Sequence, residues 1–117
     1  METSYVFAGL AVTSRDEAAA WYERLLGRPP DGLPNDLEAT WQLTPTASLY
    51  LVAGTGQPGR GQILLIVADL DARMAEIRAR GIEPGAIEQV GEAGRKCACA
   101  DPDGNVVALA QLATGST

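Results

Sequence analysis

The chain of 117 residues contains no histidine, so few of its side chains could do chemistry. Histidine is the commonest metal ligand and a frequent general base, and its absence excludes every nucleophile that an imidazole activates. Two cysteines remain, Cys97 and Cys99, in the stretch "KCAC". On a strand they point the same way but lie too far apart to form a disulfide with each other. We expect both to be small core residues, since no further metal ligand lies nearby in the sequence.

The elements that must position such residues occur twice along the chain. The stretch "YVFAGLAV" alternates as a strand does, and Ser14 with Glu17 predicts a capping box that opens a helix. Gly27 is placed to end that helix. "QILLIV" then repeats the strand, and Asp69 and Gly81 bound a second predicted helix. Each half continues with strand material, so the sequence predicts strand, helix and three strands, twice over.

The last two predicted strands are joined by the turn "DPDG", whose proline and glycine positions are typical of a type I turn. Alternation across this turn places Ala98 and Ala108 on the face that no helix covers. Cys97 and Cys99 then fall on the helix-facing side. We expect module one at about residues 5–53, a glycine-rich linker at 54–61 and module two at 62–112, all in a single domain 1–117.

Composition and charge exclude several classes of function. The chain is 46% hydrophobic and 21% charged, as is usual for a globular protein, and its net charge is −6. An acidic surface repels phosphate backbones, so we expect no nucleic-acid partner, although it would attract a cationic small molecule. No apolar run reaches membrane-spanning length and no basic leader is present, so we expect a cytoplasmic protein that does not enter membranes.

Three motifs together resemble the vicinal oxygen chelate superfamily, which includes glyoxalase I, extradiol dioxygenases, methylmalonyl-CoA epimerase and the bleomycin-resistance proteins. They are "LAVTSRDEAAAWYERLLG", "IVADLDARMAEIRARG" and "DPDGNVVAL". The resemblance covers residues 5–112. It implies an α+β fold of two tandem βαβββ modules whose mixed sheets form an open cup, the glyoxalase/bleomycin resistance fold. It also implies a homodimer, because many members of the superfamily are homodimers.

The same resemblance assigns four positions to the metal ligands of the metal-dependent members. These positions hold Phe7, Tyr50, Gln62 and Ala108. A phenyl ring and a methyl group donate nothing, and one neutral amide cannot replace the hydration of a hard divalent ion. The sequence therefore predicts no metal site and no cofactor.

A cup without metal would present an apolar surface to an organic ligand. The expected ligand-binding residues are Phe7, Tyr50, Leu64 and Ala108, with Gln62 orienting the ligand through its amide. Trp41 is a further candidate. A five-residue loop over residues 44–48 would turn it toward the helix, whereas one bulge would turn it into the cup, and both orientations stay open. Trp21 lies on the helix stripe and is expected in the core.

We therefore expect a metal-independent small-molecule-binding protein of the bleomycin-resistance type, which could sequester an antibiotic-like ligand. The alternative is a lyase, isomerase or other enzyme of the superfamily that works without the usual metal ligands. It would need a base inside the cup, and alternation offers only Tyr5, Tyr50 and the cysteines, with no carboxylate on an inward row. A third interpretation is a degenerate module kept for partner interaction. We assign no catalytic residue.

Overall fold

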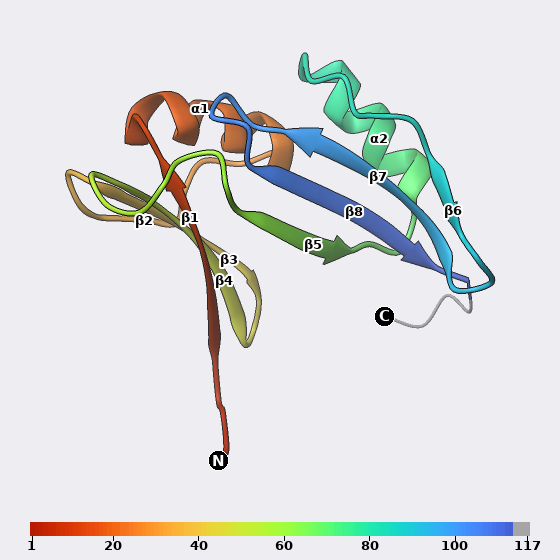
Figure 1. The fold of residues 1–117 in the computed structure, drawn as a ribbon, viewed down its shortest axis with the longest axis horizontal. Coiled ribbons are helices and arrows are strands. Elements are labelled where there is room, and N and C mark those ends of the chain that lie inside the picture. The colour runs from red at the N-terminus through yellow and green to blue at the C-terminus, as the bar shows by residue number, and fades with distance from the viewer. Residues whose placement is uncertain (114–117) are drawn as a thin grey trace.

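The computed structural model describes residues 1–113, which form two four-stranded sheets and two helices (Figure 1). The first module contains β1 (Val6–Val12), α1 (Arg15–Leu26), β2 (Gly32–Asn35), β3 (Glu38–Thr44) and β4 (Ala47–Ala53). The second contains β5 (Gln62–Ile66), α2 (Leu70–Ala79), β6 (Glu88–Val90), β7 (Gly94–Ala100) and β8 (Val106–Leu112). The predicted α+β fold of two tandem βαβββ modules is confirmed. Neither helix in the described part is long and apolar enough to cross a membrane.

The two sheets have the same topology, β1-β4-β3-β2 and β5-β8-β7-β6. In each, the first strand runs parallel to the last strand of its module, and the other pairs are antiparallel. Gly9 is paired with Tyr50 in one sheet, and Leu64 with Ala108 in the other. Tyr50 and Ala108 therefore occupy equivalent positions, as the repeat predicted.

Local sequence signals fix both helices at their first residues. The Ser14 hydroxyl accepts a hydrogen bond from the Glu17 amide at 3.2 Å, and the Asp69 carboxylate caps α2 in the same way. These side chains satisfy backbone N–H groups that have no partner within the helix. Gly27 ends α1 with φ +82°, a left-handed conformation that favours glycine.

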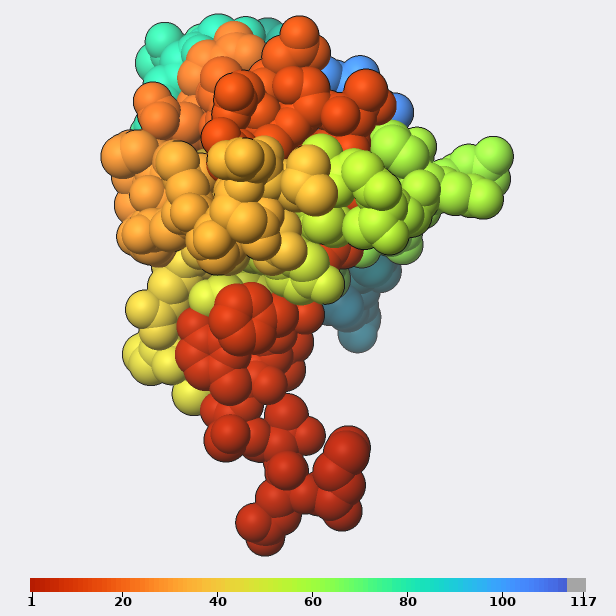
Figure 2. All heavy atoms as spheres, turned by 90° about the vertical axis from the view of Figure 1, so that its left-hand side faces the viewer, coloured from red at the N-terminus to blue at the C-terminus, as the bar shows by residue number. Residues whose placement is uncertain are grey.

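Both modules contribute to one hydrophobic core. It contains the helix-facing rows of both sheets and the apolar stripes of both helices. The predicted core residues Trp21, Cys97 and Cys99 are all buried there, and the two cysteines are free. Burial raises the pKa of the Cys99 thiol to about 11, so it stays protonated at neutral pH. Val6 is exposed although it alternates in register with the buried Leu10 and Val12, because the start of β1 projects beyond the body of the protein (Figure 2).

Trp41 lies in this core and not in the cup. Its side chain is fully buried, and the indole Nε1 donates to the Arg28 carbonyl at 3.0 Å. The five-residue loop considered over residues 44–48 does not form, because Thr44 pairs directly with Ala47 across a tight turn. That short turn alone would reverse the orientation of Trp41, but a register shift at Leu43 restores it. Trp41 is therefore not part of the candidate site.

The "DPDG" turn joins the two modules through a buried polar network. The Tyr22 hydroxyl of α1 donates to Asp101 Oδ2 at 2.8 Å. Asn105 Nδ2 donates to the Ala11 carbonyl of β1, and its Oδ1 accepts from the Gly61 amide, both at 2.9 Å. Burial, followed by the hydrogen bond to Asp101, raises the pKa of Tyr22 far above its usual value. The hydroxyl is therefore a permanent donor to a buried carboxylate.

We predict that Tyr22→Phe lowers the free energy of unfolding by about 1.5–3 kcal/mol, the range for a lost hydrogen bond to a charged group. Urea unfolding followed by circular dichroism measures it. Tyr5→Phe is the matched control, because the Tyr5 hydroxyl bonds only to the Ser48 hydroxyl in a part-buried setting. Equal losses in the two variants would contradict a special role for the buried network.

Candidate ligand-binding site

Each sheet has one face that no helix covers, and large apolar side chains are exposed on both. Phe7 on β1 is 59% exposed, and Leu64 on β5 is 57% exposed. The residues that alternate with Phe7 on β1 and with Leu64 on β5 point to the core, as strand alternation requires. The predicted division into a helix-facing row and an open row is therefore present in both sheets.

The open face of the first sheet carries an aromatic cluster of Tyr5, Phe7 and Tyr50. The ring centroids of Tyr5 and Phe7 are 5.0 Å apart, and those of Phe7 and Tyr50 are 6.2 Å apart. The Tyr5 hydroxyl is hydrogen-bonded to Ser48 Oγ at 2.5 Å. The Tyr50 ring lies across Gly9, where an added Cβ would come within 2.5 Å of the ring. Glycine at this position leaves room for the ring.

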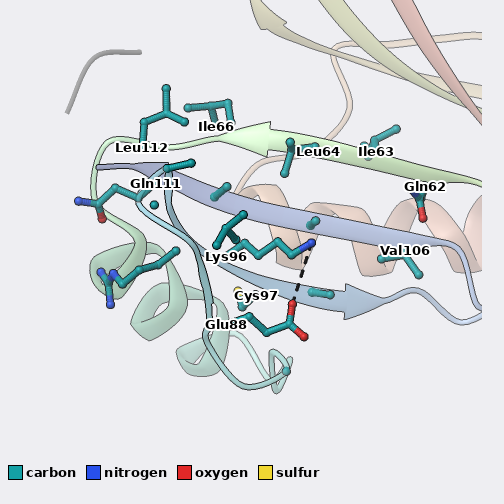
Figure 3. Close-up of a pocket in the computed structure, with 18 of the residues that line it drawn as sticks. Gln62, Ile63, Leu64, Ile66, Glu88, Lys96, Cys97, Val106, Gln111 and Leu112 are labelled. Carbon is teal, nitrogen blue, oxygen red and sulfur yellow. Dashed lines mark ion pairs between the residues drawn. The ribbon is translucent and has the colours of Figure 1, made fainter. Parts of the chain in front are cut away.

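The open face of the second sheet forms a hollow of about 730 Å³. Its floor is made of small residues from adjacent strands, Ala98, Ala108 and Ala110, and Leu64 and Ile66 stand beside it. The helices lie on the opposite side of this sheet (Figure 3). The alanines create the hollow, because larger side chains at those positions would fill it.

A few polar groups surround this apolar floor. Gln62 lies at one end, and Lys96 extends across the middle, where its Nζ is 4.0 Å from Glu88 Oε2 (Figure 3). Arg95 also borders the hollow, but its guanidinium pairs with Asp71 of α2 at 3.2 Å. Small apolar pockets with a few polar groups typically bind organic molecules.

Sequence reasoning missed both members of the Lys96–Glu88 pair. The expectation that no carboxylate faces the cup is wrong, because Glu88 pairs across the strands with Lys96 on the open face. The alternation that placed Ala98 there also places Lys96 there, two residues earlier. Glu88 belongs to a strand of three residues, which is too short for alternation to fix its orientation.

The structure separates the predicted site residues into two groups. Gln62, Leu64 and Ala108 line the hollow together. Phe7 and Tyr50 lie on the open face of the first sheet. All the residues found to line the hollow, within the described part of the chain, belong to the second module. The predicted residues thus lie on two separate faces of the chain.

The sequence matches the family profile described as "Glyoxalase-like domain" over residues 7–110. The chain belongs to this glyoxalase-like family, within the vicinal oxygen chelate superfamily. A glyoxalase/bleomycin resistance protein from Catenulispora acidiphila DSM 44928 is 37% identical, with 94% of this chain and 99% of that chain covered and a TM-score of 0.87. No curated protein sequence matched the chain.

Two other solved structures of the superfamily are similar to this glyoxalase-like chain. A bleomycin resistance determinant encoded on the transposon Tn5 is 25% identical, covers 94% of this chain and 98% of its own, and has a TM-score of 0.77. A lactoylglutathione lyase from Agrobacterium tumefaciens is 16% identical, covers 95% of each chain, and also has a TM-score of 0.77. The second likeness shows the fold alone.

The residues of this glyoxalase-like domain do not fit the metal ion that many superfamily members hold. The four equivalent positions carry Phe7, Tyr50, Gln62 and Ala108, which offer one phenol and one neutral amide between them. Among residues 1–113, no three His, Cys, Asp or Glu side chains are grouped so that they could hold a metal. A divalent ion needs several charged or imidazole donors, so we derive no metal chemistry here.

We predict that Ala108→Glu does not create a metal site, because a single carboxylate remains without charged or imidazole partners at the other three positions. After equilibration with zinc or nickel and gel filtration, elemental mass spectrometry should find far less than one ion per chain, because a weakly bound ion dissociates during the filtration. One tightly held ion per chain would contradict this assignment of the positions.

Proposed function

We propose that this protein binds a small organic molecule in the hollow of the second sheet and does so without a metal. The observation that carries the proposal is the hollow itself, about 730 Å³ over a floor of alanines with few polar groups around it. Its size and apolar character suit a ring-bearing ligand. The likeness to a bleomycin resistance determinant supports binding, and sequestration of an antibiotic-like molecule is one form of it.

One observation favours the alternative, an enzyme of the lyase or isomerase kind without the usual metal ligands. The carboxylate of Glu88 lies at the hollow and would be the catalytic base. Its side chain is 70% exposed and ion-paired with Lys96, which is the setting of an ordinary surface acid. The cysteines offer no substitute, because burial raises the pKa of both thiols. Binding is therefore the function we favour.

We further propose that the ligand is enclosed between two copies of the chain. The helix-facing sides of both sheets share one core, which leaves both open faces on the outside of the molecule. An exposed apolar face of this kind marks an interaction site. In a homodimer, the aromatic cluster of one protomer would lie over the hollow of its partner. This arrangement would unite Phe7 and Tyr50 with Gln62, Leu64 and Ala108.

We predict that filling the hollow abolishes binding. N-phenyl-1-naphthylamine, a neutral apolar dye that fluoresces when sheltered from water, should bind the native protein. Ala108→Trp should remove this signal, because the indole would occupy the floor. Ala75→Trp, at an exposed position on α2, is the control and should leave the titration unchanged. Equal binding by native protein and Ala108→Trp would place the ligand elsewhere.

We predict that Phe7→Asp converts the dimer to monomer with little loss of monomer stability, because Phe7 is 59% exposed in the single chain. A buried, unpaired carboxylate at the interface would be strongly unfavourable. Sedimentation equilibrium measures the effect. Ile87→Asp, at an exposed position beside α2, should leave the dimer intact. A native protein that is monomeric at all concentrations would refute the assembly.

A further inference from the structure

Lys96 is the only lysine in the sequence, and it lies at the hollow. The other eight of the nine cationic side chains are arginines. Lys96 is in β7, where the register aligns it with Ala110, and Ala110 in turn with Ile66. Its aliphatic stem therefore crosses the apolar floor toward Gln62, and its ammonium group lies over the middle of the hollow (Figure 3).

The Lys96 ammonium group is weakly engaged by the protein. Its nearest acid oxygen, Glu88 Oε2, is 4.0 Å away, which is too long for a hydrogen bond. The two side chains are 45% and 70% exposed, and such surface pairs contribute little. Within residues 1–113, no hydrogen bond from Lys96 Nζ is found, so three strong N–H donors face the hollow and solvent.

Arg95, the other cation at the hollow, is not available in the same way. Its Nη1 and Nη2 donate to the two carboxylate oxygens of Asp71 at 3.5 and 3.2 Å, on the helix side of the sheet. Its charge is therefore already matched. Lys96 is left as the cation that can meet a ligand on the open face.

We propose that the ligand of this hollow is an apolar organic anion, and that its acidic oxygen binds Lys96 Nζ. This inference rests on the proposed binding function. The rings of the ligand would lie on Ala98 and Ala108, and Gln62 would meet a polar group at the far end. The Lys96 side chain runs from the row of Ile66 back toward Gln62, so its ammonium group lies over the middle of the hollow (Figure 3). The site therefore suits a ring-bearing molecule whose carboxylate, sulfonate or phenolate lies beside its rings.

The acidity of the whole chain does not oppose this assignment. The net charge of −6 led us to expect attraction of a cationic ligand, but charges beyond about 8 Å are largely screened at physiological salt. Selection inside the hollow depends on the groups that touch the ligand. Glu88 is the group that an incoming anion would displace, and its exposed side chain is free to turn toward water.

Two dyes that differ by one charged group test the assignment. 8-Anilinonaphthalene-1-sulfonate carries a sulfonate that N-phenyl-1-naphthylamine lacks, on the same ring system. Lys96→Met removes the charge and keeps an apolar stem. We expect it to weaken binding of the sulfonate dye about tenfold, as the loss of one charge-assisted hydrogen bond implies, and to leave the neutral dye within about twofold.

Three controls make the result specific. Lys96→Arg keeps the charge and should retain most of the affinity for the sulfonate dye. Glu88→Gln removes the competing acid and should strengthen that affinity. Arg73→Met removes an equal charge from α2, where Arg73 pairs with Glu76, and should change neither dye.

The outcomes separate this inference from the proposed function. If both dyes bind but Lys96→Met weakens neither, or weakens both equally, Lys96 does not recognise an anion and the inference is wrong. If neither dye binds the folded native protein, the proposed binding function fails and the inference fails with it. Selective loss of the sulfonate dye in Lys96→Met, with recovery in Lys96→Arg, supports both.

Discussion

The carboxylate of Asp101 is 5% exposed, so protein groups must supply the hydrogen bonds that water would otherwise give. One oxygen accepts from the Asp103 and Asn105 amides within its own turn. The other accepts from Asn105 Nδ2 and from the Tyr22 hydroxyl of the first module. Loss of any partner of a charge buried in this way would be strongly destabilising. The contact fixes the second module against α1 and the end of β1.

This contact determines where the two parts of the proposed ligand site lie. With the helix-facing rows of both sheets directed into one core, the aromatic cluster and the hollow are left on open faces. Neither half is complete. The aromatic cluster offers rings without a floor, and the hollow offers a floor without a cover. The buried network thus stabilises an arrangement in which a second copy would complete the proposed site, and this is the basis of the proposed dimer.

Much of the fold could be predicted from the sequence because its signals are local. Ser14, Gly27 and Asp69 mark helix ends by hydrogen bonding and backbone geometry, and alternation separates the core rows from the open rows. The strand β2 was not placed, because "GLPN" has neither alternation nor strong strand propensity. The sequence could not show which face of the sheet the Trp41 side chain is on. That depends on the length of the next turn and on a bulge, and each of these reverses the effect of the other.

The apolar residues of the candidate site and Gln62 were predicted, but the Lys96–Glu88 pair was not. The positions of Leu64 and Ala108 on the open face follow from strand alternation. The same alternation also places Lys96 there, two residues before Ala98. The orientation of Glu88 could not be predicted, because its strand of three residues is too short for alternation to fix it. The separation of Phe7 and Tyr50 from Gln62 is likewise a property of how the modules pack, and not of either module alone.

A native mass spectrum of the untagged protein tests the central claim most directly, because it reports subunit number, metal and bound organic molecule together. The account predicts a dimer at twice the bare chain mass, alone or with an organic adduct whose mass would lead to the ligand. A monomer at all concentrations, or a reproducible increment of one metal ion per chain, would contradict a metal-free site completed by a second copy.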